Sequence, residues 1–245
     1  MVDGSANFQG PHGPWPVGWW VRRVAETGST NADLLAEGTE GAKHHTVLMA
    51  DFQTAGRGRL DRTWDAIRGA NLLVSLLFRT DDRPLHHWTQ IVGLAAREAL
   101  RDVAGADVEM KWPNDLLARN AKIAGILAQT GVGFVVVGIG VNVGWAPEGA
   151  VCVRDVSGST CTPVEVLAAM LPHVDRLEAM TTTQLHEHYV ASLATIGQRV
   201  RVELADAEVI GTAVGVGVDG RLHVVDDCAL SHHVDTGDVV HLRAV

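Results

Sequence analysis

Apolar residues recur along the chain with two different periods, which predict a protein built of both helices and strands. In the segment 86–103, Trp88, Ile91 and further apolar residues lie three or four positions apart, as one buried helix face requires. The run 133–143 is so apolar that both faces of the strand it predicts should be buried. The predicted strands are 20–26, 45–52, 71–78, 108–111, 122–129 and 133–143, and the predicted helices are 31–37, 86–103, 163–180 and 182–193.

The pattern changes near Thr195, where helical spacing gives way to short apolar runs separated by Gly and Asp. From residue 198 onward, four or five short strands with turn signals between them suit a small β-barrel. We therefore predict an α+β protein with a mixed β-sheet and flanking helices. The predicted domains are an irregular leader over 1–19, a catalytic domain over 20–194 and a small C-terminal β domain over 195–245.

Composition and charge narrow the classes of function. With 47% hydrophobic and 20% charged residues and no apolar stretch long enough to cross a bilayer, the 245 residues predict a soluble globular protein without a membrane partner. Cys152, Cys161 and Cys228 form no Cys-x-x-Cys pair, which disfavours a disulfide framework or a zinc ribbon and favours the reducing cytoplasm. A net charge of -9 argues against a general nucleic-acid binder.

A Gly- and Arg-rich stretch without apolar periodicity separates the strands predicted at 45–52 and 71–78, and it predicts a long loop. We call residues 53–64 the arginine loop. Arg57 and Arg59 alternate with glycines that let backbone N–H groups approach an anion, which suits phosphate or carboxylate. Taken alone, a solvated surface loop explains these residues equally well. Trp64 offers a flat apolar surface that either packs under a ligand or anchors the loop.

The sequence Lys-Trp-Pro-Asn-Asp at 111–115, which we call the strand-end motif, follows a predicted strand, where ligands usually bind. Pro-Asn-Asp by itself is ordinary turn chemistry, but the flanking Lys and Trp make this turn less ordinary. Further on, Lys122 precedes an apolar strand in which Gly125 permits the close approach of another group. A single lysine at a strand edge is more often only solubilising.

Other motifs are set aside. The glycines from Gly138 to Gly144 resemble a dinucleotide-binding fingerprint, but the third glycine falls one residue late and Pro147 stands where a helix should begin. No P-loop pattern occurs. The histidine doublets lack companion ligands at metal-binding spacing, and we interpret them as surface residues. These doublets are His44-His45, His86-His87 and His232-His233.

In order and spacing, the remaining motifs resemble the catalytic domain of the biotin protein ligases, from Thr27 to Val143 almost continuously. The segments that carry the resemblance are 28–31, 53–64, 69–72, 111–115, 122–127 and 138–142. The tail from Thr195 resembles that family's small SH3-like domain. The resemblance implies an enzyme that joins the biotin carboxylate to the α-phosphate of ATP and releases pyrophosphate. Biotin then passes from biotinyl-5'-AMP to a lysine of a biotin carboxyl carrier protein.

The resemblance also implies the roles of individual residues. The expected biotin-binding residues are Ser29, Thr30, Asn31, Gln53, Gly56, Arg57, Arg59, Lys122 and Gly125. The expected ATP-binding residues are Arg57, Arg59, Trp64, Lys111, Asn114, Lys122 and Asn142. The expected catalytic residues are Arg59, Lys111, Asp115 and Lys122. Mg²⁺ is expected to be held chiefly by the triphosphate, with Asp115 as the nearest carboxylate.

Two features depart from the family pattern. Many relatives carry a basic residue or His and then Gly after the second loop arginine, whereas this chain has Leu60 and Asp61. Because Asp tolerates left-handed backbone, we expect the turn to survive, while the charge of Asp61 opposes nearby phosphate and alters closure of the loop over the intermediate. The residues before Ala25 are too few for a helix-turn-helix domain, so we expect no operator binding.

Two alternative functions are considered. A lipoate or octanoate protein ligase shares the adenylation chemistry, although the arginine loop together with the strand-end motif favours biotin. A non-catalytic nucleic-acid-binding module would use the same loop but needs more basic surface. The expected partner is a biotin carboxyl carrier protein or domain, with no nucleic acid, and the expected assembly is a monomer or a homodimer.

Overall fold

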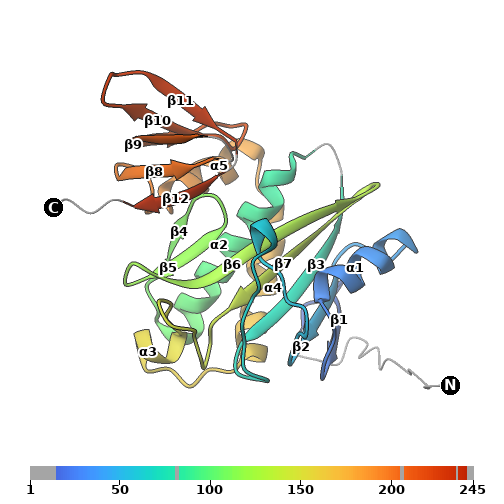
Figure 1. Ribbon diagram of the computed structural model, residues 1–245. Coiled ribbons are helices and arrows are strands. Elements are labelled where there is room, and N and C mark those ends of the chain that lie inside the picture. Colours follow the sequence, from blue (N-terminus) through green and yellow to red (C-terminus); the bar gives the residue numbers. More distant parts are fainter. Residues whose placement is uncertain (1–14, 81–82, 205–206, 236, 242–245) are drawn as a thin grey trace.

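The structure is a computed structural model that describes residues 15–80, 83–204, 207–235 and 237–241 (Figure 1). The side chain of Asp61 also lies outside the described part. Most of the leader predicted at 1–19 falls among the residues that are not described.

A mixed sheet forms the centre of the larger domain. Its strand order is β1-β2-β3-β7-β6-β5-β4. The first two strands pair in parallel and all other neighbours pair antiparallel, which confirms the predicted mixed sheet. The strands are β1 (Trp20–Val24), β2 (Thr46–Ala50), β3 (Leu72–Arg79), β4 (Glu109–Lys111), β5 (Asp115–Ala118), β6 (Ala121–Gly131) and β7 (Phe134–Val141).

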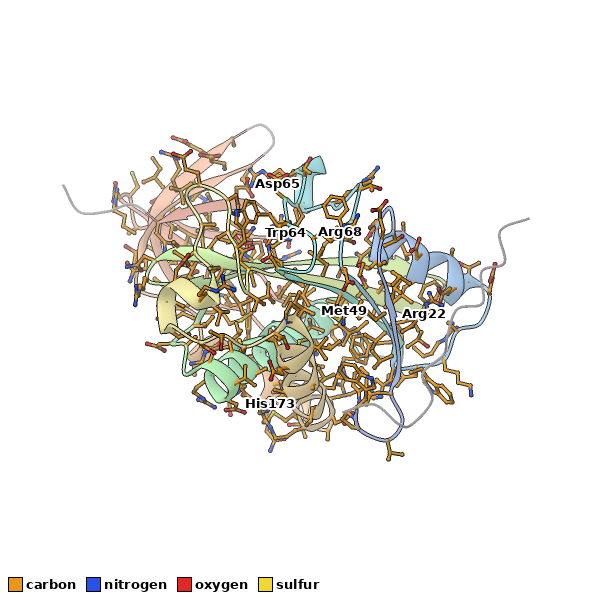
Figure 2. The ribbon with its side chains drawn as sticks, turned by 90° about the horizontal axis from the view of Figure 1, so that it is seen from below. Arg22, Met49, Trp64, Asp65, Arg68 and His173 are labelled. Carbon is orange, nitrogen blue, oxygen red and sulfur yellow. The ribbon has the colours of Figure 1, made fainter. Side chains whose placement is uncertain are left out.

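Helices cover the two faces of this sheet unequally. The helix α1 (Thr30–Thr39) packs on one face, and α2 (Leu85–Ala104) and α4 (Pro163–Glu178) pack against each other on the opposite face. Figure 2 shows Trp64 and His173, a residue of α4, on opposite sides of the sheet. The remaining helices of the described part are α3 (Val153–Ser157) and α5 (Thr182–Ala191), and a single 3-10 turn spans Arg59–Asp61.

The strand β7 divides its residues between these two faces, because successive side chains of a strand point in opposite directions. Val135, Val137 and Ile139 belong to the large core that contains α2 and α4. Phe134 and Val136 belong to a smaller core with Leu34 of α1. The next positions on the α1 side are glycines 138 and 140, so the sheet surface lies bare there.

Two elements were not predicted from the sequence. The strand β5 begins at Asp115, directly after the turn of the strand-end motif, and its pairing with β4 makes that turn a hairpin. A short helix, α3, ends at Gly158, which takes the left-handed conformation with φ of 73°. Both elements are too short to show a helical or strand period in the sequence.

The interpretation of the histidine doublets as surface residues was wrong for His87. Its side chain is buried on the core side of α2, one helical turn before Ile91, with 2% of its surface exposed. Burial lowers the pKa of His87 to about 4, and the charges of His86 and Arg83 act in the same direction. The apolar spacing of the sequence predicts the helix, but it does not indicate that the polar residue His87 lies at the start of the buried face.

The same interpretation was wrong for His44 and His45, which are half-buried. The ring of His45 stacks on Trp19 with 3.9 Å between centroids. The Nε2 atoms of His44 and His45 lie 3.1 Å and 2.8 Å from the carboxylate oxygens of Glu178 at the end of α4. These three side chains join the start of β2 to the helical layer, a contact between segments far apart in the sequence.

A second sheet follows the last helix, and it confirms the predicted C-terminal β domain. Its strands are antiparallel neighbours in the order β11-β10-β9-β8-β12. They are β8 (Arg199–Glu203), β9 (Glu208–Val216), β10 (Leu222–Asp226), β11 (Ser231–Val234) and β12 (Asp238–His241). Figure 1 shows this C-terminal sheet beside the β4 end of the large sheet. Within the described ranges, no helix has the length and apolar character needed to span a bilayer.

Candidate active site

A cavity of about 130 Å³ opens on the α1 side of the large sheet, next to the bare glycine positions of β7. It brings together four segments that are separate in the sequence: the start of α1, the arginine loop, the strand-end motif and the start of β6. The sequence-predicted residues that line it are Ser29, Thr30, Asn31, Gln53, Arg57, Arg59, Trp64, Asn114, Asp115, Lys122 and Gly125.

The N-terminus of α1 is held to the start of the arginine loop. Gln53 Oε1 accepts hydrogen bonds from the backbone N–H of Thr30 at 2.7 Å and from its hydroxyl at 3.0 Å. The segments pair locally because Thr27 and Gln53 form a parallel bridge. Ser29 is the N-cap residue of α1, yet its side chain makes no capping hydrogen bond, so its hydroxyl is left for the cavity that it lines.

Asn31 fastens the same helix to the sheet. Its amide nitrogen donates to the backbone oxygen of Leu127 at 3.1 Å and to Gln129 Oε1 at 2.9 Å, and its amide oxygen accepts from Ser75 at 2.6 Å. A Cβ at Gly138 would lie 2.2 Å from this amide oxygen. The glycine therefore makes the space that Asn31 occupies.

The arginine loop folds as a narrow hairpin. At its base, Trp64 N donates to Gly56 O at 3.0 Å, and nearer the tip Gly58 N donates to Arg62 O at 2.7 Å. The 3-10 turn at the tip places Leu60 in the left-handed region, with φ of 54°. The turn is present, as expected, but its left-handed residue is Leu60 and not Asp61. A branched side chain there strains the backbone.

Trp64 lies flat on the sheet over two glycines of adjacent strands. A Cβ at Gly140 of β7 would lie 2.3 Å from the indole ring, and one at Gly125 of β6 would lie 2.9 Å from it. Gly125 and Gly140 face each other in the β6–β7 register. Any side chain at either position would displace the ring. The two glycines therefore make the space that Trp64 occupies, and they fix the position of the end of the arginine loop. The predicted close approach at Gly125 is confirmed.

Asn114 connects the strand-end motif to both the sheet and the arginine loop. Its amide nitrogen donates to Ile126 O at 2.8 Å, and its backbone oxygen accepts from Ile126 N at 2.9 Å. The amide oxygen accepts a hydrogen bond of 3.2 Å from the guanidinium of Arg59. The peptide bond between Trp112 and Pro113, just before Asn114, is cis.

The charged residues form a compact group at one end of the cavity. Lys122 Nζ lies 2.7 Å from Asp115 Oδ1 and 5.5 Å from the centre of the Trp64 ring. Lys111 is the direct partner of Asp115 across the β4–β5 hairpin. Burial lowers the pKa of Lys111, while the negative charge of Asp115 raises it and the positive charge of Lys122 lowers it further.

Three predicted residues do not line this cavity. Gly56 lies at the base of the loop, where a Cβ would come within 3.1 Å of Trp64 O. Lys111 is not among the lining residues, although its amine interacts electrostatically with Asp115, Lys122 and Asp238, which are. Asn142 is buried with 1% exposure, its side chain donating to Val151 O at 3.2 Å and its backbone N–H to Ile123 O at 2.8 Å. It therefore supports Ile123, the residue after Lys122, and Val151, whose backbone N–H donates to the backbone oxygen of Lys122.

Sequence reasoning missed several residues of the site. Ser75, a buried residue of β3, joins Thr30 and Asn31, and nothing in the apolar run around it signals that role. Gly138 and Gly140 carried a signal, because alternate glycines in a strand leave one face of it bare. Asp238 of β12 also lines the cavity, and it comes from the C-terminal sheet.

One group of side chains in the described ranges has the composition of a metal site, and it lies outside the cavity: His44, His45 and Glu178. The hydrogen bonding argues against a metal there. His44 Nδ1 accepts a hydrogen bond of 3.0 Å from the backbone N–H of Arg79, so the proton of the neutral ring resides on Nε2, the atom that faces Glu178. We interpret the cluster as a hydrogen-bond network between the two histidines and the Glu178 carboxylate.

A wider groove of about 700 Å³ adjoins the cavity and shares its wall at Arg59 and Asn114. Its lining includes the apolar residues Leu60 at the loop tip and Trp112, and also Gly220 from the turn between β9 and β10. The groove therefore meets the cavity beside the arginine loop and the strand-end motif.

Comparisons with known proteins identify the family. Residues 23–145 match the family described as biotin/lipoate A/B protein ligase, and residues 195–242 match the biotin protein ligase C-terminal domain. The chain is 40% identical over 235 residues to biotin–[acetyl-CoA-carboxylase] ligase of Mycobacterium tuberculosis, an alignment that covers 90% of this chain and 88% of the relative.

A relative of the same name from Paracoccus denitrificans is 31% identical over 223 residues, covering 81% of this chain and 91% of the relative. Among solved structures, the biotin protein ligase of Aquifex aeolicus in complex with biotin and ATP superposes with a TM-score of 0.79 at 25% identity. That superposition covers 91% of this chain and 99% of the other.

Proposed function

This chain belongs to the biotin/lipoate A/B protein ligase family and is a biotin protein ligase, and we propose that it biotinylates a carrier protein in two steps through biotinyl-5'-AMP. The observation that carries the proposal is the convergence of α1, the arginine loop, the strand-end motif and Lys122 on one cavity. The relatives that cover most of this chain are biotin–[acetyl-CoA-carboxylase] ligases by name, which supports a carboxylase carrier domain as the acceptor.

In the first step, a carboxylate oxygen of biotin attacks the α-phosphorus of ATP, and the bond to the β-phosphate breaks to release pyrophosphate. Two anions must approach each other, so fixed positive charge at the meeting point lowers the barrier without reorganising during the reaction. Arg57, Arg59 and Lys122 line the cavity and supply that charge. Lys111, which interacts electrostatically with Asp115 and Lys122, adds to the same field.

The biotin end of the cavity is the part formed by the start of α1. Thr30 and Asn31 are locked by Gln53 and Ser75, so they form a rigid wall rather than mobile side chains. The hydroxyl of Ser29, which does not cap the helix, is the group free to bond a polar atom of biotin. Rigid walls favour binding because little conformational freedom is lost when the ligand enters.

The nucleotide end is the part beneath the arginine loop. Trp64 offers its ring there, and Asn114 links Arg59 to the sheet, so the loop and the strand-end motif move together. Asn142 acts indirectly, by supporting the backbone beside Lys122. A closed loop also shields the mixed anhydride from water.

Magnesium fits this site as a companion of the triphosphate. Asp115 presents a carboxylate to the cavity, but one of its oxygens is already paired with Lys122, so the chain offers few free oxygen ligands there. Mg²⁺ commonly keeps several waters and takes one or two carboxylates together with substrate phosphates. When bound, it would neutralise phosphate charge, and Asp115 is the residue that would hold it.

In the second step, the neutral amine of a carrier lysine attacks the acyl carbon of biotinyl-5'-AMP, the bond to the phosphate oxygen breaks, and AMP leaves. The side chain of a free lysine has a pKa of about 10.4 and is protonated at neutral pH, so it must lose a proton before its amine attacks. Asp115 lines the cavity directly after Asn114, a residue that the cavity and the groove share, and it can orient that amine. The 700 Å³ groove is the route by which the carrier segment enters.

One assay tests the proposal and its main alternative. Pyrophosphate release from ATP is measured with biotin, lipoate, octanoate or no acid, and transfer to a carboxylase carrier domain is then followed by mass spectrometry. Biotin-dependent release followed by a single biotinylated lysine is expected. Pyrophosphate release that depends on lipoate or octanoate instead of biotin would show that the enzyme activates that acid. If no acid stimulates release, the assignment as a ligase is overturned.

A further inference from the structure

The C-terminal sheet reaches the active-site cavity. Asp238, the first residue of its edge strand β12, lines the cavity together with Arg57, Trp64 and Lys122. Its carboxylate is only 23% exposed. A negative charge at the wall of a cavity that receives a polyanion is unfavourable unless a cation neutralises it.

The cation that neutralises Asp238 comes from the arginine loop. Arg62 forms an ion pair with the Asp238 carboxylate, and Arg59 donates a hydrogen bond of 3.4 Å to the backbone oxygen of Gly237. The two contacts lie on either side of the loop tip at Leu60. The hairpin is therefore fixed at its base by Gly56 and Trp64, and near its tip by the C-terminal sheet.

The C-terminal sheet is itself attached to the strand-end motif. Trp112 donates from its indole nitrogen to Gly220 O at 3.0 Å and from its backbone N–H to Thr195 Oγ1 at 3.1 Å. Ala194 N donates to Met110 O at 2.8 Å, which fastens the connecting segment to β4. Asp238 is therefore held in a frame that also carries Asn114, the other contact of Arg59.

From these contacts we propose that Asp238 is a positioning residue, which holds Arg62 so that the arginine loop stays closed over the cavity with Arg59 facing Asn114. The consequence for the reaction, retention of biotinyl-5'-AMP, rests on the proposed function. The C-terminal sheet thus takes part in the adenylation site through one carboxylate. The ion pair is partly exposed, with 66% of the Arg62 side chain in solvent, so its effect is modest and sensitive to salt.

Limited trypsin digestion tests the position of the loop without relying on biotin chemistry. The loop carries cleavage sites after Arg57, Arg59 and Arg62. The rate of cleavage after Arg57 and Arg59, the two sites that every variant keeps, reports how often the loop opens. Asp238→Asn should raise that rate about two- to fivefold, as expected for loss of an exposed ion pair. The matched control is Asp227→Asn, which removes another ion pair of the same sheet, that with Arg199.

A charge exchange separates positioning from general damage. Arg62→Asp alone should open the loop as Asp238→Asn does, whereas the double variant Arg62→Asp with Asp238→Arg should restore protection, because the pair is rebuilt with its charges reversed. Midpoint temperatures of all variants are measured in parallel. Equal cleavage rates in wild type, Asp238→Asn and Asp227→Asn, or a double variant no better protected than Arg62→Asp, would overturn the proposal.

The link to catalysis is measured as the release rate of labelled biotinyl-5'-AMP from the enzyme after dilution. Asp238→Asn should release it about two- to fivefold faster than wild type, with the difference shrinking at high salt. If wild type forms no biotin-dependent adenylate, the proposed function fails while the trypsin result still decides the role of Asp238. Faster cleavage with unchanged adenylate release would refute the link to retention.

Discussion

Arg59 and Asn114, which are 55 positions apart in the chain, meet in a hydrogen bond of 3.2 Å between the guanidinium and the amide oxygen. The contact joins the arginine loop to the strand-end motif. Because Asn114 is also bonded to Ile126 through its amide nitrogen and its backbone oxygen, this contact ties Arg59 to the rigid sheet.

Removal of Arg59 should therefore loosen the loop and weaken retention of the intermediate. We expect Arg59→Gly to release biotinyl-5'-AMP at least about tenfold faster, because hydrogen bonds that involve a charged group contribute about 1.5–3 kcal/mol. The measurement is the appearance of free adenylate in solution. Arg68→Gln is the matched control, since Arg68 pairs with Glu26 and does not line the cavity. If Arg59→Gly retains biotinyl-5'-AMP as well as wild type does, the loop does not act as a lid.

The seat of Trp64 predicts a steric effect at Gly140. A Cβ there would meet the indole ring at 2.3 Å, so Gly140→Ala should displace the ring and destabilise the protein by about 1–3 kcal/mol. Urea unfolding measures the loss, and pyrophosphate release should fall with it. Gly215→Ala provides the control, because a Cβ at Gly215 meets nothing within 4 Å. If both variants behave as wild type, Trp64 is not seated as described.

The left-handed backbone of Leu60 predicts that glycine is the better residue at the loop tip. Left-handed backbone costs about 1–2 kcal/mol for residues with a Cβ, and glycine avoids this cost. Glycine in turn loses about 0.5–1 kcal/mol because it has greater conformational freedom in the unfolded chain. Leu60→Gly should consequently slow trypsin cleavage of the loop relative to Leu60→Ala, which keeps the strain. Faster cleavage of the glycine variant would show that the Leu60 side chain itself secures the tip.

Acid should weaken the contact between β2 and α4 through Glu178. Burial raises the pKa of this carboxyl, but hydrogen bonds from His44 and His45 outweigh burial and lower the pKa to about 2. A depressed carboxyl pKa stabilises the fold above the ordinary value near 4.5, and the contribution is lost as pH falls toward 2.

Glu178→Gln should accordingly lower the free energy of unfolding at pH 7 by about 1–3 kcal/mol, and its difference from wild type should shrink between pH 4.5 and 2. Urea unfolding at several pH values follows this convergence. Glu187→Gln, which changes an exposed carboxylate of α5, serves as the control. A difference that stays constant with pH would assign the stability to packing rather than to charge.

The sequence by itself determined the elements with a clear period and the motifs with local chemistry. The apolar spacing of 86–103 located α2, and the continuous apolar run of 133–143 located β7, because burial of one or both faces leaves a mark at each position. The arginine loop and the strand-end motif were recognisable because their glycines, cations and turn residues are contiguous.

The tertiary structure alone decided which distant residues meet. Asp238 lies 176 positions from Arg62, and no local pattern marks a strand-initiating aspartate as part of a cavity wall. The same holds for Ser75 beneath Thr30, for Gly140 beneath Trp64 and for buried His87. Local periodicity reports whether a side chain is buried, whereas the partner it is buried against depends on the sheet order and on how the C-terminal sheet docks, and these are properties of the whole chain.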